Sequence, residues 1–174
     1  MALREILTEP NDILRKKSLP VENVDKSIQE LMDDMLETMY AAPGIGLAAI
    51  QVGIPKRIIV MDISKKKDEK VPMYFVNPEI LNKSDDNSVY EEGCLSVPGQ
   101  FAEIERPKKC KIKFLDYYGH PNEIDAEGML ATCIQHEMDH LEGILFIDYL
   151  SKLKKTMIVK KLSKQKKELE RIVV

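Results

Sequence analysis

Apolar side chains recur every three or four positions between residues 25 and 42, which is the spacing that buries one face of an α-helix. Asp25 precedes this stretch as a helix N-cap residue, and Pro43-Gly44 ends it. The pattern therefore predicts a helix over 25–42, and we interpret its methionine-rich face as core packing. The residues of that face are Ile28, Leu31, Met32, Met35, Leu36 and Met39.

Apolar residues alternate with lysines between residues 109 and 114, which is the period of a half-buried strand. Cys110 lies on the apolar side of this alternation and is predicted to be a small core residue. Strands are predicted at 57–63, 73–77, 110–116 and 121–125. The charged stretches 64–70 and 83–88 are predicted to be solvated loops.

Two further helices are predicted nearer the C-terminus. The first covers 126–142 and is followed by Gly143, a residue that commonly ends a helix. The second covers 148–172. Short strands with few helices favour an α+β fold over a doubly wound one. We therefore predict short antiparallel sheets packed around the central helix, with a helix at the C-terminus.

The length and composition are those of an ordinary globular chain. Its 174 residues suit one domain with a full core. No stretch approaches the roughly 20 apolar residues of a membrane span, and the N-terminus lacks the apolar segment of a signal peptide. Three scattered cysteines do not resemble a disulfide framework. We therefore expect a cytoplasmic, reducing location and no membrane partner.

The net charge of −3 conceals an uneven distribution. Residues 151–174 carry nine basic side chains against two acidic ones, a net charge of +7 that leaves −10 for residues 1–150. The main body is acidic and the C-terminal helix is basic. This helix is either a solvated element packed on the body or a surface for a polyanion.

The candidate chemistry begins with His136 and His140, which are four positions apart on a predicted helix and so leave the same face. Glu137 lies beside them, which completes the H-E-x-x-H pattern of hydrolytic metal sites, where the glutamate is a general base. The third histidine, His120, lies in a predicted turn and is expected to be exposed. The alternative is a chance match on a charged helix.

Two histidines leave a metal ion under-coordinated, so a third protein ligand is required. Phe146 stands where one extended form of the motif has a third histidine, and residues 160 and 161 are lysines where another form has a glutamate. Cys133 lies seven residues from His140, about 10 Å along a helix axis. Cys94, in an expected irregular segment before Pro98-Gly99, is then the leading candidate, although elimination alone does not decide it.

Three segments together resemble the signature motifs of bacterial peptide deformylases (the type 1, iron-dependent family), in the same order and with similar separations. They are Gly44-Ile45-Gly46-Leu47-Ala48-Ala49-Ile50-Gln51, Glu92-Gly93-Cys94-Leu95-Ser96 and Gln135-His136-Glu137-Met138-Asp139-His140. The similarity covers nearly the whole chain. It implies a catalytic deformylase domain over 1–150, with the basic helix 151–174 as part of the same domain.

The resemblance implies a metal-dependent hydrolase that removes the formyl group from the N-terminal formylmethionine of nascent polypeptides and releases formate. Cys94, His136 and His140 would bind one divalent metal, with water in the fourth position. Fe(II) is expected natively, and Zn, Ni or Co also suit such a ligand set. Glu137 would transfer the proton, while the Gln51 amide and the Leu95 backbone N–H would stabilise the oxyanion.

By the same resemblance, an apolar pocket would hold the methionine side chain of the substrate. The residues implied in substrate binding are Ile45, Gly46, Tyr90, Gly93, Met129, Thr132 and Cys133. This chain departs from a common form of the family at two positions. Phe101 stands where some members have arginine, and Thr132 stands where an aliphatic residue is common.

The resemblance also suggests that the basic helix docks on ribosomal RNA near the nascent-chain exit. Two other functions deserve comparison with this one. A zincin-like peptidase would act on unformylated peptides, but the downstream third ligand of such enzymes is absent. A non-catalytic metal-binding or peptide-binding protein would need neither a base at Glu137 nor a donor at Gln51.

Overall fold

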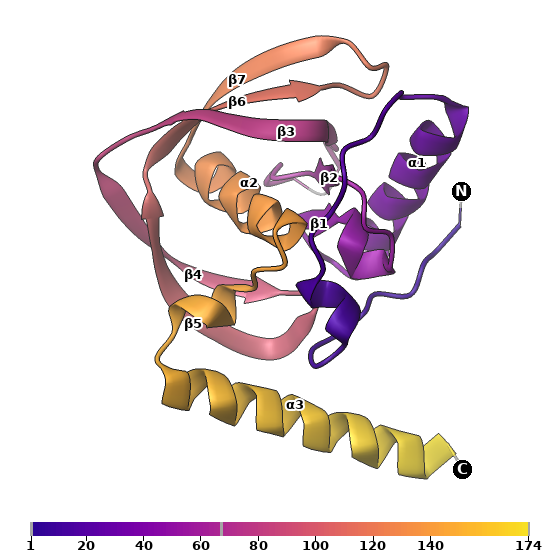
Figure 1. Ribbon diagram of the computed structural model, residues 1–174, viewed down its shortest axis with the longest axis vertical. Helices are drawn as coiled ribbons and strands as arrows, with labels where there is room; N and C mark the ends of the chain where they lie inside the picture. The colour runs from indigo at the N-terminus through magenta and orange to yellow at the C-terminus, as the bar shows by residue number, and fades with distance from the viewer. Residues whose placement is uncertain (1, 67, 174) are drawn as a thin grey trace.

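The computed structural model describes residues 2–66 and 68–173 (Figure 1). The longer elements are α1 (Lys26–Ala41), β1 (Gly46–Ala48), β2 (Ile58–Met61), β3 (Met73–Lys83), β4 (Asn87–Cys94), β5 (Val97–Pro107), β6 (Lys109–Leu115), β7 (Pro121–Glu127), α2 (Gly128–Leu141) and α3 (Lys152–Val173). Short 3-10 helices cover Asp12–Arg15, Ala49–Val52 and Phe146–Tyr149. The predicted fold class, α+β with antiparallel sheets around a central helix, is confirmed.

The strands form two separate antiparallel sheets. One has five strands in the order β1-β2-β3-β6-β7, and the other is the hairpin β4-β5. Helix α2 lies between the five-stranded sheet and the hairpin, as Figure 1 shows. Strand β1 is at the edge of its sheet, paired with β2 on one side only. Within residues 2–66 and 68–173, no other strand pairs with the second backbone edge of β1, and β1, the hairpin and α2 line one cavity.

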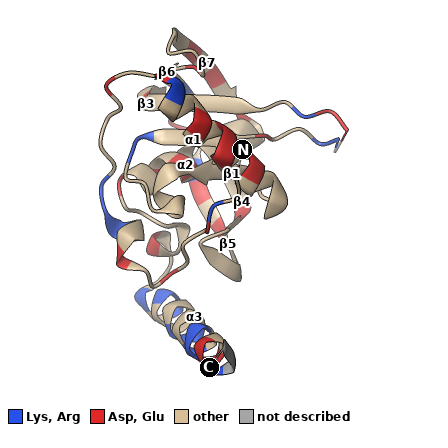
Figure 2. Ribbon diagram, turned by 90° about the vertical axis from the view of Figure 1, so that its right-hand side faces the viewer, with Lys and Arg blue, Asp and Glu red and all other residues tan. Residues whose placement is uncertain are grey.

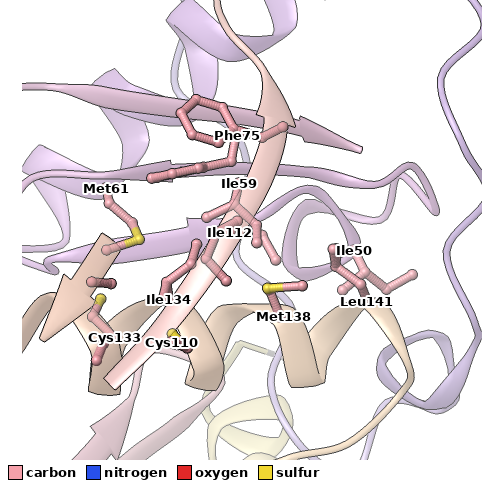
Figure 3. Packing of buried hydrophobic residues seen from close by; sticks show 14 residues of the cluster. Ile50, Ile59, Met61, Phe75, Cys110, Ile112, Cys133, Ile134, Met138 and Leu141 are labelled. Carbon is pink, nitrogen blue, oxygen red and sulfur yellow. The ribbon is translucent and has the colours of Figure 1, made fainter. Parts of the chain in front are cut away.

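The main core fills the space between the five-stranded sheet and α2. Ile59, Met61 and Phe75 from the sheet pack against Ile134 and Met138 of α2 (Figure 3). Four of these five side chains are fully buried, and each such side chain stabilises the fold by roughly 1.5–3 kcal/mol. This core fixes α2 against the sheet, and α2 carries the H-E-x-x-H motif.

Helix α1 covers the opposite face of the same sheet. Ile58 and Val60 pack with its methionine-rich face, while their strand neighbours Ile59 and Met61 belong to the core with α2. This alternation follows from the two-residue period of strand β2. The Asp25 side chain accepts a hydrogen bond from the Ile28 N–H and caps the helix, which confirms the predicted start.

Several element boundaries differ from the predictions. Strand β3 continues to Lys83 and β4 begins at Asn87, so the predicted loop 83–88 shrinks to three residues. The hairpin β4-β5 was not predicted, because most of its alternate residues are polar and exposed and give no apolar period. The predicted loop 64–70 contains no helix or strand in its described residues, with Lys67 lying outside them.

The helices also begin later than predicted. Strand β7 extends to Glu127, so α2 begins at Gly128 rather than 126. Gly143 follows α2 with a positive φ of 75°, and an added Cβ would lie 2.3 Å from the Arg15 carbonyl oxygen, so glycine is required there. The predicted helix 148–172 begins at Lys152, because Leu150 is extended between a 3-10 turn and α3.

Helix α3 contacts the body through a small apolar seam. Leu162 is 4% exposed and packs in one cluster with Val97 and Ile104 of β5. Figure 2 shows lysine and arginine concentrated along α3 and acidic residues on α1. None of the helices within residues 2–66 and 68–173 combines the length and apolar character that crossing a membrane requires.

Candidate active site

Cys94, His136 and His140 come together where the end of β4 meets α2. One potential ligand atom from each residue lies within 4.8 Å of the other two, and Cys94 Sγ is 3.3 Å from His140 Nε2. The histidines are one helical turn apart and share a face of α2. Cys94 is the last residue of a strand, not part of an irregular segment as expected, and the hairpin turn presents its thiol to α2.

The other two cysteines lie elsewhere. Cys110 is buried in the core, as its alternating pattern predicted. Cys133 is buried on α2 and lines the pocket beside the three clustered residues. Burial raises the pKa of the Cys133 thiol well above its usual value, with Glu137 adding to the effect, so this thiol stays protonated. His120 is exposed in its turn, as expected.

The donor set suits a divalent transition metal. One thiol and two imidazoles form a mixed set that Zn, Fe, Ni and Co all accept, and three protein ligands leave one position free for chemistry. Burial and the neighbouring His136 hold the pKa of His140 well below its usual value, which favours the neutral form of this ring. The residues present therefore fit a catalytic metal centre.

A buried ionic network, which no local sequence pattern indicates, holds His136 in position. Glu92 Oε1 lies 2.8 Å from His136 Nδ1, which leaves the other ring nitrogen to face Cys94. Arg106 donates two hydrogen bonds to the Glu92 carboxylate, at 2.7 and 2.9 Å. Both side chains are about 5% exposed, and their residues meet only because β4 and β5 pair as a hairpin.

The network continues to Asp139, whose partners were not predictable. Arg106 Nη1 donates to Asp139 Oδ2 at 2.8 Å, and the Tyr149 hydroxyl donates to the same oxygen at 2.7 Å. Burial disfavours the charged form of His136, but hydrogen bonds with Cys94 and Glu92 outweigh it and raise the pKa of this ring. For Glu92, burial is likewise outweighed by His136 and Arg106, so its pKa is lowered and the carboxylate is ionised.

Glu137 points into the pocket from α2 and is 4% exposed. Its Oε2 has no hydrogen-bond partner within the described residues, and its Oε1 lies 3.9 Å from His136 Nε2. Burial, offset in part by His136, raises the pKa of Glu137 to about 7. An added Cβ at Gly46 would lie 2.9 Å from Glu137 Oε1, so only glycine lets β1 approach this carboxylate so closely.

Gln51 reaches the same place from the 3-10 helix after β1 and is 1% exposed. Its Oε1 accepts a hydrogen bond from the Ala48 N–H at 2.9 Å. This bond aims the amide NH₂ at the site, where Nε2 lies 3.0 Å from Ser96 Oγ and 3.6 Å from Cys94 Sγ. Leu95 follows Cys94 in the hairpin turn and lines the same pocket.

A cavity of about 490 Å³ opens beside this cluster, between β1, the hairpin and the N-terminal half of α2. It is lined by every residue implied in substrate binding, namely Ile45, Gly46, Tyr90, Gly93, Met129, Thr132 and Cys133. Phe101 also lines the cavity and is 66% exposed, with its ring against Gly93 of the paired strand. The cavity lining therefore includes an exposed aromatic ring at Phe101.

Comparisons with known proteins agree with this geometry. The sequence profile of the polypeptide deformylase family matches residues 3–156. A peptide deformylase of Pelagibacter ubique is 68% identical over the full length of both chains. The crystal structure of a peptide deformylase from Ehrlichia chaffeensis superposes with a TM-score of 0.90 at 43% identity, covering 95% of this chain and 97% of that one. A second structure from that organism, in complex with actinonin, gives 0.89 at 45% identity, covering 95% and 98%.

Proposed function

Because this chain belongs to the polypeptide deformylase family, we propose that the cavity beside α2 is the active site at which it removes the formyl group from N-formylmethionyl peptides. The products are formate and a peptide with a free amino terminus. The observation that carries this proposal is the meeting of Cys94, His136 and His140 with Glu137 and Gln51 in one pocket.

Cys94, His136 and His140 are assigned as ligands of one divalent metal, with Fe(II) as the expected native ion and Zn, Ni or Co as alternatives. When bound, such an ion acts as a Lewis acid that promotes hydrolysis of the formyl amide. The Glu92–Arg106 pair orients His136 through its Nδ1 atom. These partners fix the orientation of the His136 ring toward the other two proposed ligands.

Glu137 is assigned as the general base and then the general acid. Its Oε2, which has no hydrogen-bond partner among the described residues, takes a proton from the attacking water as the oxygen adds to the formyl carbon. The same carboxyl group then gives a proton to the amide nitrogen as the C–N bond breaks. Proton transfer of this kind requires a carboxyl group facing the reacting atoms and shielded from bulk water, which matches its burial.

Gln51 and the backbone N–H of Leu95 are assigned as donors to the oxyanion that forms on the formyl carbon. The Ala48 N–H fixes the orientation of the Gln51 amide, so its NH₂ is aimed before the substrate arrives. A neutral amide donates a hydrogen bond without adding a second base beside Glu137.

Gln51→Ala is expected to lower kcat by about 10²–10³, with metal content unchanged, because one oxyanion donor is lost. Steady-state formate release and metal analysis on the same preparation measure both quantities. Ser96→Ala, which removes only the hydroxyl partner of Gln51 Nε2, is the control and should cost far less. A Gln51→Ala enzyme within threefold of the wild-type kcat would exclude the donor role.

The peptide itself is proposed to lie along the open edge of β1, near Gly44–Gly46, and beside Gly93 of β4. Edge strands bind extended peptides through backbone hydrogen bonds, which accept many sequences. The methionine side chain then enters the cavity lined by Tyr90, Met129 and Cys133.

The proposed activity is tested by purifying the protein without oxygen, measuring its metal and assaying formate release. Formyl-Met-Ala-Ser should yield formate, while Met-Ala-Ser should remain intact. Cleavage of the unformylated peptide would instead identify a peptidase. No formate release from a protein with one bound metal per chain would contradict the proposal.

We further propose that the enzyme acts in the cytoplasm on nascent chains and docks on ribosomal RNA through α3. Lys160, Lys164 and Lys167 are exposed on this helix, and RNA phosphates attract such a surface in a salt-dependent way. Truncating α3 would also uncover the apolar seam at Leu162, so charge changes are the cleaner test.

The triple variant Lys160→Glu, Lys164→Glu, Lys167→Glu is expected to lose co-sedimentation with ribosomes at low salt, while its kcat on a free tripeptide stays at the wild-type value. The triple variant Lys109→Glu, Lys111→Glu, Lys113→Glu on β6 changes the net charge by the same amount and is the control. Equal co-sedimentation of wild type and the α3 variant would remove the docking proposal.

A further inference from the structure

Thr132 places a hydroxyl group in a part of the pocket where an apolar side chain would be enough to hold the methionine side chain of the substrate. It lies four residues before His136 on α2, on the helix face that also carries Met129 and Cys133. The residue is 5% exposed and lines the cavity assigned to the first side chain of the substrate.

This hydroxyl is not used by the fold. Threonine in a helix often donates to the carbonyl four residues earlier, as Thr38 does to Asp34 and Thr156 does to Lys152. Thr132 makes no such bond, and no other hydrogen bond of its hydroxyl occurs among the described residues. The Thr132 oxygen is not one of the fully buried side-chain atoms that lack a partner, so water can reach it. A substrate side chain that fills the cavity displaces such water, and a group that accepts a hydrogen bond from the hydroxyl replaces what is lost.

A second hydroxyl lies at the same end of the cavity. Tyr90 of β4 is half-buried and lines the cavity, and its oxygen is 4.0 Å from where a Cβ of Gly128 would lie, at the start of α2. Gly128 is one turn before Thr132 on α2. The lining formed by β4 and the first turns of α2 therefore includes two residues with O–H donors, while Cys133 is a weak donor.

We propose that Thr132, with Tyr90 beside it, determines specificity for a side chain that accepts a hydrogen bond, and that peptides beginning with formyl-methionine sulfoxide are therefore substrates. The inference rests on the proposed function. Methionine sulfoxide keeps the length of methionine but adds one strongly accepting oxygen and a chiral sulfur. A wholly apolar pocket would strip this oxygen of water without replacing its hydrogen bonds.

The test compares formyl-Met-Ala-Ser, its norleucine analogue and the two separate sulfoxide epimers, using the metal-loaded enzyme. For the wild type, kcat/KM for the better epimer is expected within about tenfold of that for formyl-Met. The epimers should differ, because both hydroxyls lie on one wall. Formate release from formyl-Met but not from either sulfoxide would overturn the inference while leaving the proposed function intact.

Thr132→Val removes the hydroxyl and keeps the shape of the side chain. It is expected to lower the ratio of sulfoxide to norleucine kcat/KM by about tenfold, mainly through KM, and Thr132→Ser should restore the ratio. Thr156→Val, the same change on exposed α3, should leave the ratio unchanged. An unchanged ratio in Thr132→Val, or an equal loss for every substrate, would overturn the inference, since a bound water would then satisfy the hydroxyl.

Discussion

Glu137→Ala is expected to lower kcat/KM for a formylated peptide by about 10²–10⁴ while metal content stays at the wild-type level. The carboxyl group is buried, its Oε2 has no partner among the described residues, and it lies next to both Gly46 and His136. No other carboxylate lining the cavity can replace it, because Glu92 is held by Arg106 and Glu91 is exposed.

Glu137→Gln is the matched control for this result. The amide keeps the volume and the burial of the side chain but cannot accept and return a proton, so its loss should equal that of Glu137→Ala. Formate release and metal analysis, both done without oxygen, separate a defect in proton transfer from a loss of metal. Near-normal turnover by either variant would exclude Glu137 as the general base.

Arg106→Ala is expected to lower the free energy of unfolding by about 3–5 kcal/mol, because it leaves the buried Glu92 carboxylate without its main partner. Glu92 would then contact His136 without the guanidinium group that now holds the carboxylate. The affinity of the site for metal should therefore fall by about 10–100-fold. Arg106→Lys should not restore either property, since one ammonium group cannot make the two parallel bonds of the guanidinium.

Urea denaturation of the metal-free proteins measures the change in the free energy of unfolding caused by Arg106→Ala. Competition with a chelator measures the change in metal affinity. Arg4→Ala is the control, because Arg4 pairs with Asp34 at the surface, where an ion pair contributes at most about 1 kcal/mol. If Arg106→Ala cost no more than Arg4→Ala, the network would not be a structural support of the site.

Much of the fold could be predicted because the core follows simple periods. The α1 stripe and the β6 alternation are each determined by local burial on one face, so their positions emerged to within a few residues. The hairpin β4-β5 was not predicted because its exposed face carries apolar residues such as Val89 and Phe101, while its buried residues include Glu92 and Arg106. Its inner face packs on residues distant in sequence, as Val97 and Ile104 do with Phe146, and local periodicity does not report such contacts.

The residues of the candidate site also fall into those that local spacing predicts and those that it does not. His136, Glu137 and His140 lie on one helical segment, so spacing alone predicted that they act together. Cys94 was the leading third ligand by elimination, and the resemblance then supported it. Gln51 was selected through the resemblance alone, since nothing local shows that it approaches α2. Arg106 and Tyr149 were missed entirely, because only the tertiary fold brings them to Glu92 and Asp139. The boundaries 1–150 and 151–174 and the individual residue roles stay predictions.

The origin of the three proposed ligands has a consequence for folding. Cys94 belongs to a two-stranded hairpin, whereas His140, 46 positions later, belongs to the helix at the centre of the main core. A metal ion held by both is a cross-link that closes a long loop of chain, and such closure stabilises the native state against the unfolded one. Availability of metal would thus set the lifetime of the folded protein as well as its activity, and a cell short of metal would hold less of the enzyme, not just an inactive pool.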